Sequence, residues 1–189
     1  MMKEEVRYGS RTFVPSIPSQ EIHEAVIHVA DRLNRDYAGK DPILLVMLNG
    51  AFMFASDLVK ELEFECVISF IKVSSYAGTA STGQVTELIG LDVDVRDRDV
   101  IIIEDIVESG LTMHQAVDQL KRAGAATVEI CAFVHKPMKL IYHDVKPKYV
   151  GLNIKDSFII GYGLDIDGYA RNLPEVYELQ TAEDRISHK

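Results

Sequence analysis

The sequence of 189 residues contains no tryptophan, only two cysteines, and only short uninterrupted apolar runs. A membrane-spanning helix needs roughly 20 predominantly apolar residues, and no run approaches that length. The beginning of the sequence, MMKEEVRYGS, is polar and lacks the apolar core of a secretion signal. We therefore expect no membrane span and no export, and we expect a cytoplasmic location.

The two cysteines, Cys66 and Cys131, each lie in an apolar run, which favours buried reduced thiols over a disulfide or a metal-thiolate site. Basic residues are also few, because 20 Lys and Arg stand against 29 Asp and Glu, a formal net charge of −9. Sequence-tolerant nucleic-acid binding needs a basic surface, so no nucleic-acid partner is expected. An anionic small molecule remains possible, since backbone amides, a few cations and a divalent metal can hold one.

The composition is that of an ordinary globular protein, with 47% hydrophobic and 26% charged residues. Its length suits a single domain spanning 1–189. Apolar residues recur at helical spacing between Pro18 and Tyr37, and short continuous apolar runs alternate with further helical patterns. The predicted strands are 43–48, 66–73, 99–104 and 127–134, and the other predicted helices are 51–62 and 112–124. This order predicts an α/β fold with a mostly parallel twisted sheet flanked by helices.

Two smaller expectations complete the fold prediction. After residue 145 the sequence becomes rich in Gly and Tyr, which we interpret as a small cap and not a separate domain. The six histidines show no metal-binding spacing, and His135 is expected at the surface.

Three acids follow the apolar part of the stretch VIIIEDIVESGLT at 100–112. Ligands of open α/β sheets bind outside the carboxyl ends of the strands, so Glu104 and Asp105 are expected in that crevice. Successive strand residues point in opposite directions, and carboxylates suit sugar hydroxyls or hydrated Mg²⁺.

The helix-entry loop, residues 108–112, follows this acid pair. Free amides at a helix start, the helix dipole and two hydroxyls favour an anion there, and Gly110 allows close approach. Taken alone, an N-terminal cap with solvated acids explains the pattern equally well, whereas a Walker-type loop is excluded because GxxxxGK[ST] is absent.

The stretch VIIIEDIVESGLT resembles the phosphoribosyl pyrophosphate (PRPP) signature of type I phosphoribosyltransferases. Three more segments resemble the hypoxanthine-guanine branch of that family: LLVMLNGAFMFASDL (44–58), SSYAGTASTGQV (74–85) and FIIGYGLDIDGYARNLPEVYEL (158–179). The resemblance extends from about Val6 to Leu179. It implies the type I phosphoribosyltransferase fold, with a hood formed by roughly 1–18 and 150–189.

The resemblance also implies roles for the acid pair and the helix-entry loop. Glu104 and Asp105 would hold the ribose hydroxyls, directly or through Mg²⁺. The 5′-phosphate would lie on the helix-entry loop, whose residues are Glu108, Ser109, Gly110, Leu111 and Thr112. Glu108 stands where the family usually has Asp, the residue assigned to proton transfer at the purine, and would take that role. Glu has a similar acidity, but its side chain is one methylene longer. The alternative is a helix cap.

By the same resemblance, Asn49, Gly50 and Arg171 would bind pyrophosphate. The family commonly has a non-proline cis peptide at this turn. Without that precedent, Asn-Gly indicates only a turn, and Arg171 indicates a surface ion pair.

Lys136, Phe158, Ile159 and Asp165 would bind the purine, and Asp165 would also approach a second Mg²⁺. A lysine only donates hydrogen bonds, so Lys136 would favour a 6-oxopurine over adenine. The alternatives are a surface lysine, core apolar residues and a turn acid.

The resemblance implies a Mg²⁺-dependent purine-salvage transferase that makes IMP, GMP or both from PRPP and a free base. Ser75 and Tyr76 would belong to a mobile loop that closes over the site and excludes water. The family forms dimers and tetramers, so a homodimer or homotetramer is expected. Two alternatives stay open: a transferase of the same fold that uses another base such as xanthine, and a non-catalytic regulator that senses PRPP or nucleotides.

Overall fold

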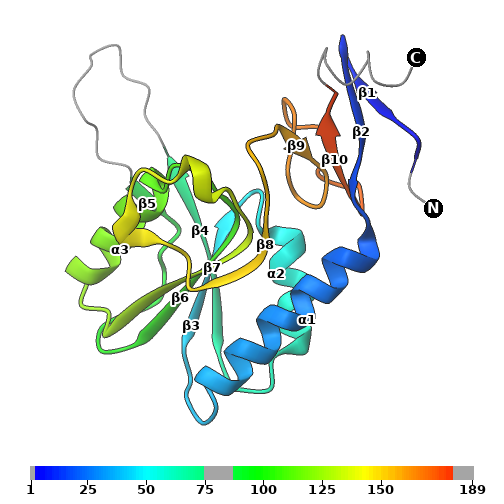
Figure 1. Ribbon diagram of the computed structural model, residues 1–189. Helices are drawn as coiled ribbons and strands as arrows, with labels where there is room; N and C mark the ends of the chain where they lie inside the picture. The colour runs from blue at the N-terminus through cyan, green and yellow to red at the C-terminus, as the bar shows by residue number, and fades with distance from the viewer. Residues whose placement is uncertain (1–2, 75–86, 181–189) are drawn as a thin grey trace, which may run out of the picture.

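The computed structural model describes residues 3–74 and 87–180, which form two sheets and the helices around them (Figure 1). The large sheet has six strands in the order β5-β4-β3-β6-β7-β8. All neighbours pair in parallel except β4 and β5. This arrangement confirms the predicted mostly parallel sheet. Its strands are β3 (Ile43–Leu48), β4 (Val67–Ser74), β5 (Glu87–Ile89), β6 (Asp99–Val107), β7 (Thr127–His135) and β8 (Tyr149–Asn153).

Helices cover both faces of the large sheet, with α1 and α2 on one face and α3 on the other (Figure 1). This cover explains the continuous apolar run of β3, because a strand enclosed on both faces has no polar side. Each fully buried Leu, Ile or Val contributes about 1.5–3 kcal/mol to folding. The helical segments are α1 (Ser19–Asp36), α2 (Phe52–Leu58), α3 (Leu111–Arg122), and the short 3₁₀ turns η1 (Val59–Glu61), η2 (Pro137–Lys139) and η3 (His143–Val145).

Two sequence predictions differ from the structure in this layer. β6 continues to Val107, beyond the predicted end at 104, because its backbone keeps pairing with β7 as far as His135. The acid pair therefore lies within the strand. His135 was expected at the surface, and that prediction was wrong: it is 2% exposed, with Nδ1 3.1 Å from the Asn153 Oδ1 atom.

The small sheet lies beyond the carboxyl ends of the parallel strands and forms the hood (Figure 1). It is antiparallel, in the order β1-β2-β10-β9, and so joins both ends of the described chain. A separate apolar cluster that includes Phe13, Ile160 and Tyr177 holds it together. β8 (Tyr149–Asn153) overlaps the range 150–189 predicted for the hood but belongs to the large sheet. The strands of the hood are β1 (Val6–Tyr8), β2 (Arg11–Ile17), β9 (Ile159–Ile160) and β10 (Val176–Leu179).

No helix among residues 3–74 and 87–180 combines the length and the apolar character that a membrane span requires.

Candidate active site

The acid pair sits at the centre of the large sheet, near the carboxyl end of β6. Glu104 is 9% exposed and Asp105 is half-buried. The Asp105 amide donates to Glu104 Oε1 at 3.0 Å, and the Ile106 amide donates to Asp105 Oδ1 at 2.8 Å. Burial raises the pKa of Glu104, and the neighbouring Asp105 raises it further. Two crowded carboxylates of this kind favour a proton or a cation between them.

The turn after β3 lies directly against this pair. A Cβ atom added to Gly50 would overlap the Asp105 carboxylate, so only glycine leaves room for that side chain. The peptide bond between Leu48 and Asn49 is cis. On the other side, a Cβ added to Gly163 would overlap the Gly50 carbonyl oxygen. The ends of β3 and β6 and the hood segment around Gly163 therefore meet at one place.

The helix-entry loop has the form of an anion seat. Gly110 adopts a φ of +83° and precedes the first residue of α3, while Ser109 Oγ accepts a hydrogen bond from the Leu111 amide at 3.3 Å. The Ser109 carbonyl accepts from the Ile141 and Tyr142 amides at 2.9 and 3.1 Å. These bonds fix the back of the loop, and its front presents the start of a twelve-residue helix.

Lys136 follows β7 and is almost fully buried, at 3% exposed, so the alternative of a surface lysine is wrong. Its ammonium forms an ion pair with Glu108, whose side chain is 41% exposed. The structure thus joins the residue predicted for proton transfer to the residue predicted for the purine oxygen. A buried ammonium requires such a partner, since an unpaired buried charge is costly.

Two charged residues that the sequence analysis did not single out complete this group. Lys139 lies one 3₁₀ turn after Lys136, and its Nζ atom is 2.7 Å from Asp156 Oδ1. The spacing of the two lysines was visible in the sequence. Asp156 carried no signal, because only the path of the chain between β8 and β9 brings it to η2. The four-charge cluster comprises Glu108, Lys136, Lys139 and Asp156.

Asp165 and Arg171 lie together in the hood segment. Arg171 Nη2 is 2.7 Å from Asp165 Oδ1, and Arg171 Nη1 donates to the Gly163 carbonyl at 2.7 Å. The other carboxylate oxygen of Asp165 accepts from the Gly168 amide, also at 2.7 Å. Both oxygens of Asp165 are therefore engaged, as the turn and ion-pair interpretations anticipated.

Phe158 and Ile159 lie where the hood begins. Phe158 is 46% exposed, and its ring centroid is 6.0 Å from that of Phe13. Ile159 is buried in β9, where it pairs with Glu178. The exposed part of the Phe158 ring is available to stack on a flat ligand. Thr112 is exposed on the first turn of α3, and the predicted loop residues Ser75 and Tyr76 lie outside the described residues.

Comparison with known proteins agrees with this geometry. The family model of the phosphoribosyl transferase domain matches residues 18–167. An α/β sheet with an acid pair beside a helix-entry anion seat, together with this match, shows that the chain belongs to the phosphoribosyltransferase family.

The similar proteins fall in one branch of that family. A hypoxanthine-guanine phosphoribosyltransferase of Streptococcus thermophilus is 39% identical over 149 residues, which cover 78% of this chain and 82% of that protein. A hypoxanthine-guanine-xanthine phosphoribosyltransferase of Tritrichomonas foetus is 35% identical over 156 residues, 82% of this chain and 85% of that protein. A crystal structure of a Staphylococcus aureus hypoxanthine phosphoribosyltransferase superposes with a TM-score of 0.81 at 36% identity, covering 88% of this chain and 90% of that one.

Proposed function

We propose that this protein is a cytoplasmic purine-salvage enzyme that transfers the phosphoribosyl group of PRPP to hypoxanthine, guanine or both. The products are IMP or GMP and pyrophosphate. One observation carries the proposal: three features follow one another along β6 and the loop after it. They are the acid pair, Glu108 in contact with Lys136, and the helix-entry loop at the start of α3. Sugar, base and phosphate groups would then lie side by side.

The acid pair suits the ribose hydroxyls and a magnesium ion. Mg²⁺ is usually bound through one or two carboxylates together with substrate phosphates, and Glu104 and Asp105 supply that donor set. The raised pKa of Glu104 supports this role, because a cation would relieve the crowding. When bound, Mg²⁺ would neutralise the departing pyrophosphate. Asp165 fits a second ion less well, since Arg171 and the Gly168 amide engage its oxygens.

The two phosphate-bearing ends of PRPP would occupy opposite sides of the acid pair. The 5′-phosphate would accept from the backbone amides and hydroxyls of Ser109, Gly110, Leu111 and Thr112. Pyrophosphate would lie at the turn of Asn49 and Gly50, where neutral amides are the available donors. Arg171 would contact it through the N–H groups that its bonds to Asp165 and the Gly163 carbonyl leave free.

The purine would lie between the hood and the four-charge cluster. Lys136 would donate to the 6-oxo group, and the face of Phe158 would stack on the ring, an interaction of about 1–3 kcal/mol. Ile159 and Asp165 would border the far edge of the base. Adenine carries an amino group at the same position, so Lys136 would have no acceptor there.

Glu108 would transfer the proton at the purine. As the ring nitrogen forms its bond to the anomeric carbon and the pyrophosphate bond breaks, the base must lose a proton. Glu108 is half in solvent at 41% exposed and can pass a proton outward. Its contact with Lys136 must open before it can approach the base.

The proposal includes a homodimer or homotetramer. Apolar side chains on β4 and at the start of α2 are exposed: Phe52, Val67, Ile68 and Phe70 are 41–51% exposed, and Ile68 and Phe70 share one face of β4. A surface of this kind commonly marks an interface. Phe52 lies two residues after Gly50, so an interface that included Phe52 would also pack next to the turn at Asn49 and Gly50.

The test is turnover with PRPP and Mg²⁺ against hypoxanthine, guanine, xanthine and adenine in parallel. Release of pyrophosphate with hypoxanthine or guanine, and little with adenine, supports the proposal. Chelation of Mg²⁺ should abolish the reaction. Absence of pyrophosphate release with all four bases would refute the enzymatic function.

A further inference from the structure

The four-charge cluster is an alternating ring, which the function above does not require. Lys136 Nζ contacts Glu108 Oε1 and is 3.9 Å from Asp156 Oδ1. Lys139 Nζ is 2.7 Å from the same Asp156 oxygen and 3.8 Å from Glu108 Oε2. Each ammonium therefore has both carboxylates within 4 Å, one of them close and one further away.

The members of the ring differ in their access to solvent. The Lys136 side chain is 4% exposed, whereas those of Lys139, Glu108 and Asp156 are 39%, 41% and 56% exposed. Water can solvate the other three when a contact opens, but the Lys136 side chain is almost closed to it. An uncompensated buried charge is strongly unfavourable, so Lys136 is the member that depends on its partners.

Resting on the proposed function, we propose that Asp156, held by Lys139, is a positioning residue for Lys136 during purine binding. A 6-oxopurine must take a hydrogen bond from Lys136 while Glu108 turns toward the base. An ammonium has three donors, so Lys136 can serve the purine oxygen and Asp156 together. The buried charge then keeps a carboxylate partner when Glu108 leaves.

Lys139 supports this exchange from the solvent side. Its hydrogen bond to Asp156 raises the pKa of Lys139 and keeps the carboxylate within reach of Lys136. Its Nζ atom also lies 3.8 Å from Glu108 Oε2. Lys136 is the N-cap of η2 and Lys139 is its last residue, and the Lys139 amide donates to the Lys136 carbonyl at 3.0 Å. The two lysines therefore leave the backbone one 3₁₀ turn apart.

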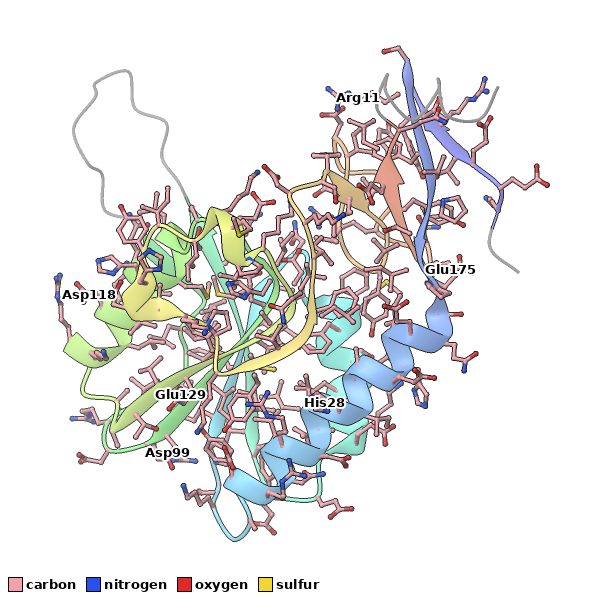
Figure 2. All side chains as sticks on the ribbon, viewed as in Figure 1. Arg11, His28, Asp99, Asp118, Glu129 and Glu175 are labelled. Carbon is pink, nitrogen blue, oxygen red and sulfur yellow. The ribbon has the colours of Figure 1, made fainter. Side chains whose placement is uncertain are left out.

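The test compares Asp156→Asn with a matched control. Asp118 on α3 forms an ion pair with Arg122 at 2.8 Å and has a side chain 50% exposed, much like Asp156, but it lies on the outer side of α3 (Figure 2). The KM for hypoxanthine and kcat are measured for wild type, D156N, D156E and D118N. Circular dichroism checks folding, and Asp156→Ala takes the place of D156N if the amide variant fails to fold.

We expect D156N to raise KM for hypoxanthine about fivefold, the scale of one partly exposed ion pair, with kcat changed less than about twofold. D156E should restore KM, and D118N should match wild type. An unchanged KM in D156N would overturn this inference. So would a lower kcat at constant KM, which is what a purely structural role predicts. Neither result would affect the proposed function. Inactivity of the wild type with all four bases would instead overturn the proposed function, and this inference with it.

Discussion

The contact between Gly163 and the turn at Asn49 and Gly50 provides the sharpest test of how the hood shapes the site. Replacing Gly163 by Ala would place a Cβ atom into the Gly50 carbonyl oxygen, with the carbonyl carbon 3.2 Å away. Backbone atoms cannot rotate out of the way as a flexible side chain can. The φ of Gly163 is +95°, a conformation that L residues rarely adopt.

The size of the effect follows from two separate contributions. A non-glycine residue held in such a conformation costs about 1–3 kcal/mol, and forcing the two backbones apart costs roughly another 1–3 kcal/mol by analogy with overpacking. Gly39→Ala is the matched control, because Gly39 has a φ of +72° but open space around its Cβ position. G39A should therefore lose only the first contribution.

Urea denaturation measures the free energy of unfolding of both variants, and steady-state turnover measures their activity. We expect G163A to be less stable than G39A and to lose about 100-fold in kcat/KM, because a displacement near 1 Å at a reacting site has that effect. G39A should retain wild-type kcat/KM. If G163A and G39A behaved alike in both measurements, the hood segment would not set the position of the turn at Asn49 and Gly50.

Three further predictions concern the acids and the exposed apolar surface. Glu108→Gln should lower kcat by about 10²- to 10⁴-fold, as expected for a lost proton-transfer group, and the exposed Glu24→Gln serves as control. If E108Q kept the kcat of wild type, Glu108 would have no role in proton transfer. Glu104 has a raised pKa in the folded protein, so its stabilising contribution is complete below its unfolded pKa and is lost as pH rises through the folded pKa. Glu104→Gln should therefore gain stability over wild type at pH 7 but not near pH 4, and Mg²⁺ should raise the melting temperature of wild type only. Phe70→Lys should reduce the mass measured by light scattering to that of the monomer; an unchanged mass would exclude β4 from the interface.

The fully buried elements were predictable from the sequence. β3 begins and ends where its apolar run does, at Ile43 and Leu48, because burial on both faces leaves a continuous signal. The first long helix was predicted between Pro18 and Tyr37, and α1 spans Ser19–Asp36. The end of β6 was not predictable locally, since pairing of Ile106 and Val107 with β7 extends it past two acids that disfavour strands.

The hood was harder to predict from the residues alone. β2 contains Pro15, which cannot donate to a ladder and therefore weakens the strand signal. The structure accommodates it opposite Tyr177, next to a register shift between Val176 and Tyr177. Residues 11–13 of β2 pair with the adjacent strand β1, but residues 13–17 pair with β10, more than 150 residues further along the chain. No local pattern carries the information for that second pairing.

The candidate site also combines residues that a local pattern predicts with residues that only the folded chain brings together. The acid pair and Gly110 were visible because a single short stretch contains them. The burial of Lys136 and its neighbours Lys139 and Asp156 depends on three separate segments meeting.

Glu108 belongs to both groups of residues. It lies in the stretch that the sequence predicted, and it forms an ion pair with Lys136, whose burial only the fold shows. An ion pair between a half-exposed carboxylate and a buried ammonium is asymmetric. Opening it exposes Glu108 to water at little cost, but it leaves Lys136 without a partner unless a second carboxylate is near. Asp156 occupies that position. Under the proposed function, binding of a 6-oxopurine would be coupled to the release of Glu108. Lys136, which would select the base, would then also free the residue proposed to move its proton. This coupling requires Lys136 to remain buried, and a Lys136→Met variant should lose discrimination between hypoxanthine and adenine together with turnover.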